Sequence, residues 1–129
     1  NVRSDRLKAI LENSCRLRVE AYKKMDSNLF ASVFANHGKL LLTGGHVITG
    51  RNIIEEKMDS FMHLVGPMEV NINIQNYWEV DNIIYEQGKY LYTSIDNGKV
   101  FNKGTYVIHW QKQDDGDYKI IDDIEIDII

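Results

Sequence analysis

The chain has 129 residues, of which 43% are hydrophobic and 26% charged, and its formal net charge is −4. These values fit a single globular domain, residues 1–129, and the acidic balance argues against nucleic acid, whose phosphates attract basic surfaces. No apolar run could span a membrane and Cys15 is the one cysteine, so we expect a disulfide-free cytoplasmic protein, with a disulfide-free secreted protein as the alternative.

The first half of the chain has helical periodicity in three segments. In residues 3–25, apolar side chains recur every three or four positions, and charged side chains fill most of the opposite side. Asp26-Ser27 then predicts a stop and a new helix cap, followed by a short helix over 27–35. The third helix is predicted over 50–66 and ends at Gly66-Pro67. Between the second and third helices, Gly44-Gly45 predicts a turn between two short strands.

After Pro67 the period changes from 3.6 residues to two. Residues 70–75 alternate apolar and polar side chains, and strands follow over roughly 80–95, 100–113 and 118–129. Hairpin turns are predicted at 96–99 and 114–117, and a turn or bulge at 87–89. Helices followed by antiparallel strands predict an α+β fold, in which three N-terminal helices pack on one face of an antiparallel sheet.

Several motifs occur in the order and spacing of one known superfamily. They are "FANH" at 34–37, "GRNII" at 50–54 and "KGTYVIHWQKQDDGDYKIIDD" at 103–123. Together they resemble the nuclear transport factor 2-like superfamily, of SnoaL-like or ketosteroid-isomerase-like type, over roughly residues 5–127. The resemblance implies a cone, in which a strongly curved sheet wraps the long helix and leaves a central pocket between its concave face and the helices.

The chain departs from that superfamily where ketosteroid isomerases carry their chemistry. The paired acids after the second helix are Asn36-His37 here, and the general-base slot holds Leu42. The two slots for oxyanion donors align near Arg18 and Ile108. Because an apolar side chain can neither take a proton nor donate a hydrogen bond, steroid-isomerase chemistry is not expected at these positions.

Asp123 is the candidate catalytic residue. It occupies a slot that faces the cavity in the resembled family, where burial would raise the pKa of its carboxyl toward the range of a general base. The alternative is a solvated carboxylate or one that caps a backbone group. Strict alternation puts Ile121, Asp123 and Glu125 on one face of the last strand. The opposite face then carries Ile120, Asp122, Ile124 and Ile126.

Aromatic side chains on neighbouring strands complete the predicted ligand pocket. Tyr106, Ile108 and Trp110 share a face that we expect to be concave, although core packing is the competing interpretation for Trp110. His46 follows the glycine turn and can reach the pocket mouth, where an Asp123–His46 pair is conceivable. The predicted pocket is lined by Tyr22, His46, Phe61, Tyr92, Tyr106, Trp110, Asp123 and Glu125. No histidine has metal-ligand spacing, so neither a metal nor a cofactor is expected.

These features leave three functions open. The first is an uncharacterised protein that binds a small hydrophobic ligand in the cone. The second is an enzyme of cyclase, isomerase or dehydratase type with Asp123 as general base. The third is a dimerisation or association module. We expect a homodimer through the outer face of the sheet, because exposed apolar strands need covering; that face would carry Val70, Ile72, Ile74, Val107, Ile120 and Ile124.

Overall fold

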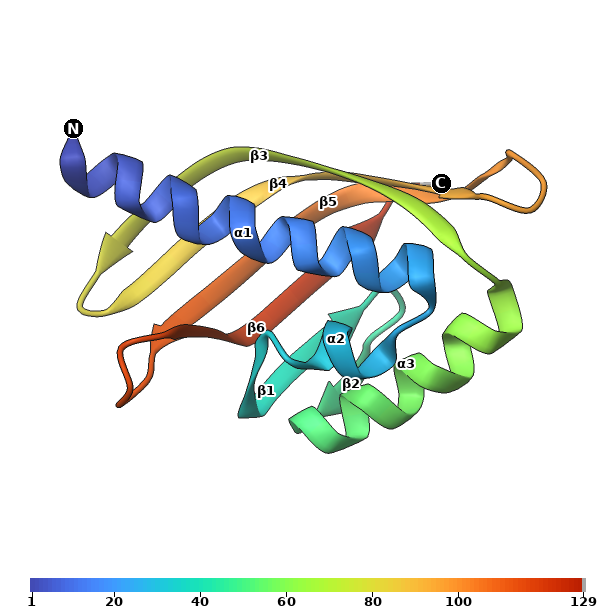
Figure 1. Ribbon diagram of the computed structural model, residues 1–129, viewed down its shortest axis with the longest axis horizontal. Coiled ribbons are helices and arrows are strands. Elements are labelled where there is room, and N and C mark those ends of the chain that lie inside the picture. Colours follow the sequence, from blue (N-terminus) through green and yellow to red (C-terminus); the bar gives the residue numbers. More distant parts are fainter. Residues whose placement is uncertain (129) are drawn as a thin grey trace.

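The computed structural model describes residues 1–128, so residue 129 of the predicted domain lies outside the described residues. The elements are α1 (Val2–Lys24), α2 (Ser27–Ala31), β1 (Phe34–Leu42), β2 (His46–Thr49), α3 (Arg51–Val65), β3 (Met68–Val80), β4 (Ile83–Ser94), β5 (Val100–Lys112) and β6 (Tyr118–Asp127). The predicted α+β class is confirmed, and α1 lies across one face of a curved sheet with α2 and α3 at one end (Figure 1).

The first two helices are bounded by local signals. The Asn1 side chain accepts a hydrogen bond from the Ser4 N–H at the start of α1, and α1 ends where Met25 adopts a left-handed φ of 56°. Asp26 then caps α2 by accepting from the Leu29 N–H at 3.0 Å. This second helix is shorter than predicted, because the Ile120 N–H donates to the Val33 carbonyl oxygen and Phe34 pairs with Ile120, so that β1 begins at Phe34.

The six strands form one sheet in the order β2-β1-β6-β5-β4-β3. Four pairings are antiparallel, as predicted, whereas β1 and β6 run parallel. A parallel pair needs a long crossover connection, and here α3 and three long strands lie between its two members. The predicted Gly44-Gly45 turn joins β1 to β2, and Asp81-Asn82 joins β3 to β4 at positive φ.

Two glycines allow the sheet to curve. Gly88 on β4 lies opposite Tyr106, and Gly104 on β5 lies opposite Tyr90. A Cβ atom at Gly88 would collide with the carbonyl oxygen of Asn73, and one at Gly104 with that of a β6 residue. Glycine therefore permits a close backbone approach at both bends, and the facing tyrosine rings cover the space above them. The predicted irregularity at 87–89 is a bulge region, since the β3 register shifts opposite these residues.

A bulge in β6 reverses the predicted alternation of its side chains. Trp110 pairs with Ile120 and His109 pairs with Asp122, so Ile121 is an extra residue. As a result, Ile120 and Asp123 both point to the helix-covered face and are buried. The prediction that Ile120 lies opposite Asp123 is wrong, because the period of two holds only along an unbroken ladder.

The predicted outer apolar surface is also corrected. Val70 belongs to the buried core, and Ile72 and Ile74 pack against it beneath α1. With Ile120 buried as well, only Val107 and Ile124 of the predicted set remain candidates for the outer face. The physical reason is that β3 turns its isoleucines toward the amphipathic helix that crosses it.

Candidate functional site

A cavity of about 280 Å³ opens between α3, the β1–β2 hairpin and the far ends of β4, β5 and β6. We call it the α3 pocket. Tyr22 near the end of α1 contributes to its wall, and Lys57 and His46 are among its polar lining residues. Most of its lining is apolar, from Leu40, Leu42, Ile48, Met58, Phe61 and Phe101. Such a concave apolar surface with a few polar groups is typical of small-molecule sites.

The polar lining of the α3 pocket is rich in hydrogen-bond acceptors. Tyr92 donates its hydroxyl hydrogen to Oε1 of Glu125 at 2.9 Å. Asn102 Nδ2 donates to Oδ1 of Asp127 at 3.0 Å, and Tyr90 donates its hydroxyl hydrogen to the same oxygen. Oδ1 of Asn102 is buried and has no hydrogen-bond partner among residues 1–128. The side chains therefore offer carboxylate and amide oxygens to a ligand that carries donor groups.

A second, much smaller cavity lies beside this pocket, with a volume of about 20 Å³. We call it the Asp123 cavity. Tyr92 and Glu125 line both spaces and so form a shared wall. The volume is close to the roughly 10–15 Å³ that one water molecule needs. The remaining lining residues are Arg18, Ile72, Tyr90, Tyr106, Ile108 and Asp123.

Asp123 is 2% exposed, and its Oδ1 has no partner within the described residues. Burial raises the pKa of the Asp123 carboxyl well above its usual value, and the negative charge of Glu125 adds to this effect, whereas Arg18 opposes it. Burial also raises the pKa of Glu125, although its hydrogen bond from Tyr92 and the charge of Arg18 act the other way. The arrangement therefore favours a proton on Asp123 and leaves Glu125 facing the α3 pocket.

A buried charge network that the sequence interpretation missed lies behind the Asp123 cavity. Glu86 is 1% exposed and accepts hydrogen bonds from Trp110 Nε1 at 2.9 Å and from the Tyr106 hydroxyl. The Arg18 guanidinium is also buried and lies 5.7 Å from the centre of the Trp110 ring. Burial opposes the charge of Arg18, but nearby Cys15 and the acids, Glu86 foremost, raise its pKa above the ordinary value. The parity of β4 could have revealed Glu86, because it shares a face with Tyr90 and Tyr92.

The structure divides the predicted pocket residues among different spaces. Tyr106 and Asp123 line the Asp123 cavity, while Trp110 lies outside both spaces. His46 meets the α3 pocket beside Glu125 and makes no hydrogen bond to Asp123 in the described structure. The other predicted pocket residues line the α3 pocket, namely Tyr22, His46, Phe61, Tyr92 and Glu125.

The slots that would hold isomerase chemistry also adjoin these spaces. Leu42 lines the α3 pocket, and Arg18 and Ile108 line the Asp123 cavity. Across residues 1–128, no three His, Cys, Asp or Glu side chains are arranged to hold a metal ion. None of the described helices combines the length and apolar character needed to cross a membrane.

The chain was compared with known families, curated proteins and solved structures. No family description matches it, and neither does any curated protein. A protein of unknown function from Mycobacterium tuberculosis superimposes with a TM-score of 0.85 at 19% identity, covering 98% of this chain and 75% of that one. A ketosteroid isomerase-like protein from Erwinia carotovora atroseptica gives 0.76 at 14% identity, with 94% and 95% covered.

A third solved structure also has a similar fold. It is classed as a calcium/calmodulin-dependent protein kinase type II association domain from Thiobacillus denitrificans, with a TM-score of 0.77 at 11% identity, covering 92% of this chain and 94% of that one. Identities this low establish architecture and not activity. These likenesses establish the fold alone, and the chain has a cystatin-like α+β fold in which helices pack on a curved sheet.

Proposed function

We propose that this protein binds a small hydrophobic compound in the α3 pocket and does so without steroid-isomerase chemistry. The observation that carries the proposal is the pocket, in which six apolar side chains surround a space whose polar lining includes the Glu125 carboxylate. Burial of apolar ligand surface there supplies the binding free energy, at roughly 25 cal/mol per Å². Leu42 and Ile108 support the absence of isomerase chemistry, because neither side chain can transfer a proton.

The acceptor-rich lining narrows the ligand class. Glu125, Asp127 and the unpartnered oxygen of Asn102 all accept hydrogen bonds. A ligand with a hydroxyl or amine on an apolar ring system would satisfy them, whereas a carboxylate ligand would meet the like charge of two carboxylates against that of one lysine, Lys57. The proposed ligand is therefore a neutral or cationic hydrogen-bond donor with an apolar body.

Three compounds with the same ring test this proposal. Binding of 1-naphthalenemethylamine, 1-naphthalenemethanol and 1-naphthoate is measured by calorimetry. We expect saturable binding of the amine and the alcohol. The carboxylate should bind at least about tenfold more weakly, a difference of about 1.4 kcal/mol in binding free energy. Phe61→Ala should weaken binding, and Leu64→Ala on the exposed side of the same helix should not. No saturable binding, or equal effects of the two variants, would refute the proposal.

The specific observation that favours an enzyme is the raised pKa of buried Asp123. In this alternative, the ionised form of Asp123 is the base for a cyclic substrate, and Glu125, which lines both spaces, carries the proton from the α3 pocket to Asp123. Deuterium exchange into 2-tetralone in D₂O, followed by NMR, tests for proton abstraction. We expect Asp123→Asn to abolish any exchange that the protein accelerates. An unchanged rate in that variant would remove Asp123 from the mechanism.

We also propose a homodimer through the outer face of the sheet. On that face Trp78 is 51% exposed and stacks on Tyr85, with ring centres 5.7 Å apart. Tyr85 contacts the His109 ring in turn, and His109 Nδ1 lies 3.2 Å from Oδ2 of Asp122. Exposed aromatic groups of this kind are enriched at protein interfaces. Light scattering at micromolar concentration should give a dimer that Trp78→Glu dissociates, and a monomeric wild type would overturn this assignment.

A further inference from the structure

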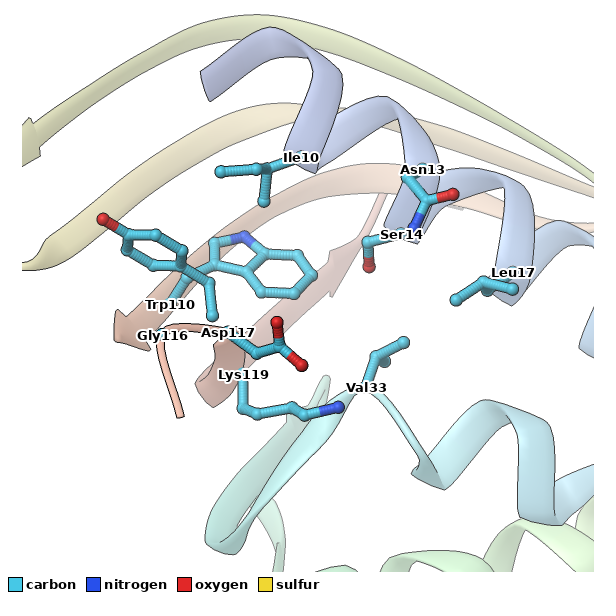
Figure 2. Close-up of a pocket in the computed structure, with 10 residues that line it drawn as sticks. Ile10, Asn13, Ser14, Leu17, Val33, Trp110, Gly116, Asp117 and Lys119 are labelled. Atoms are coloured by element: carbon cyan, nitrogen blue, oxygen red, sulfur yellow. The ribbon is translucent and has the colours of Figure 1, made fainter. Parts of the chain in front are cut away.

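A second pocket lies between α1 and the start of β6, and it shares no lining residue with the α3 pocket. We call it the α1–β6 pocket (Figure 2). Its volume is about 250 Å³, close to the about 280 Å³ of the α3 pocket, and both lie below the roughly 300–1,000 Å³ of sites for drug-sized ligands, so its occupant must be compact. Apolar walls come from Ile10 and Leu17 on α1, Val33 before β1 and the indole ring of Trp110.

Ser14 places an unpartnered hydroxyl in this pocket. Its side chain is 5% exposed, and Oγ has no hydrogen-bond partner among residues 1–128. Figure 2 shows the hydroxyl pointing from α1 into the space beside the Trp110 ring. A buried hydroxyl without a hydrogen-bond partner is unfavourable. A polar group of a bound ligand would supply the missing partner.

Two opposite charges line the same space. In Figure 2 the Asp117 carboxylate lies below the Trp110 ring, and the Lys119 side chain runs below it and ends near Val33. Lys119 Nζ donates to the carbonyl oxygen of Ser32 at 3.0 Å and keeps further protons free. Among the described residues, neither Asp117 nor Lys119 takes part in an ion pair. Both charges are therefore available to a ligand.

We propose that the α1–β6 pocket binds a compact zwitterion with an apolar body, the chemistry of a free hydrophobic α-amino acid. Its ammonium contacts the Asp117 carboxylate, and its carboxylate contacts Lys119. The apolar body packs against Trp110 and the aliphatic wall, and the Ser14 hydroxyl bonds one of the polar groups. Charge-assisted hydrogen bonds of opposite sign select a zwitterion over either singly charged analogue.

Calorimetry with L-phenylalanine, L-leucine and L-tryptophan tests the assignment, with phenethylamine and 3-phenylpropionate as analogues that lack one charge. At least one amino acid should bind saturably at a one-to-one ratio, and each of the two analogues should bind about tenfold more weakly than L-phenylalanine. Asp117→Asn and Lys119→Gln should each weaken amino-acid binding about tenfold, and Ser14→Ala by several fold. The matched control is Asp114→Asn, which neutralises a neighbouring exposed acid outside the pocket and should change nothing.

The results also separate this site from the α3 pocket. Phe61→Ala should leave amino-acid binding unchanged, because Phe61 lines only the α3 pocket. The proposal is overturned if none of the three amino acids binds at concentrations up to about 10 mM, the range of very weak affinity. It is equally overturned if the singly charged analogues bind as well as the amino acids, or if Asp117→Asn and Lys119→Gln bind like the wild type. A Ser14→Ala variant that loses stability but binds normally would assign that hydroxyl a structural role and remove it from the site.

Discussion

Trp110 on β5 donates its indole N–H to Glu86 on β4, with 2.9 Å between Nε1 and Oε1. The Tyr106 hydroxyl donates to the other oxygen of the same carboxylate, so both Glu86 oxygens have donors in the core. Burying a charge is costly unless it is hydrogen-bonded and balanced, and the nearby Arg18 guanidinium supplies the balancing charge. This network ties β4, β5 and α1 together behind the Asp123 cavity.

Removing the Glu86 carboxylate should therefore destabilise the protein strongly. Glu86→Ala leaves two buried donors without acceptors and Arg18 with less balancing charge, so we expect a loss of about 3–5 kcal/mol in the free energy of unfolding. Urea unfolding measures it. Glu69→Ala, at an exposed acid on β3, should stay within about 0.5 kcal/mol of wild type. A loss below about 1 kcal/mol in Glu86→Ala would contradict the network's role.

The stability of the protein should fall as pH rises through weakly acidic values. The folded-state pKa of Asp123 is raised by burial, so above the unfolded-state pKa of about 4 the folded protein keeps a proton that the unfolded chain has released. This difference lowers the free energy of unfolding by up to about 1.4 kcal/mol per pH unit until the folded pKa is reached. Asp123→Asn should remove this contribution and leave that of Glu125, whose pKa is also raised by burial.

The comparison is made by urea unfolding of wild type, Asp123→Asn and Asp114→Asn across the pH range above about 4. Asp114 is exposed, and its variant should keep the wild-type slope. Equal slopes in wild type and Asp123→Asn would show that Asp123 ionises normally in the folded protein.

The curvature of the sheet should depend on Gly104. Gly104→Ala forces a methyl group against the carbonyl oxygen of Ile126 and against the Tyr90 hydroxyl. The strands must move apart to relieve this clash. We therefore expect thermal and chemical unfolding to show a loss of about 2 kcal/mol or more in the free energy of unfolding. Gly45→Ala offers a comparison, because its φ of 83° is strained for alanine but no atom lies within 4 Å of the added carbon. A larger loss of stability in Gly45→Ala than in Gly104→Ala would contradict the importance of the close packing at Gly104.

Cys15 should react slowly with thiol reagents in the folded protein. Burial raises the pKa of its thiol, and the charge of Arg18 offsets this only in part. Because the thiolate is the reactive form, modification by a disulfide reagent at neutral pH should be at least about tenfold slower in native protein than in urea-unfolded protein. Similar rates in both states would show that the thiol is accessible and ionises normally.

Local patterns in the sequence are sufficient to predict the main helices and strands. The periods of 3.6 and two residues identified α1, α3 and the strands of the second half, because side-chain periodicity is set by backbone geometry within each element. The family resemblance, not a local pattern, pointed to a cavity-facing Asp123, whose side chain is buried in the structure. The sequence predicts a helix through the start of β1, because "SVFA" at residues 32–35 suits a helix or a strand. Pairing with β6 decides in favour of the strand.

The sequence by itself determined the α+β order of elements, because side-chain periodicity follows from local backbone geometry. Only the tertiary structure decided which partners the residues of these elements meet. The bulge at Ile121 put Ile120 on the same face as Asp123, and packing under α1 took Val70, Ile72 and Ile74 away from the outer surface. The two separate pockets and the bonds to Glu86 join residues far apart along the chain. Such contacts depend on strand register and helix placement, which no local period specifies.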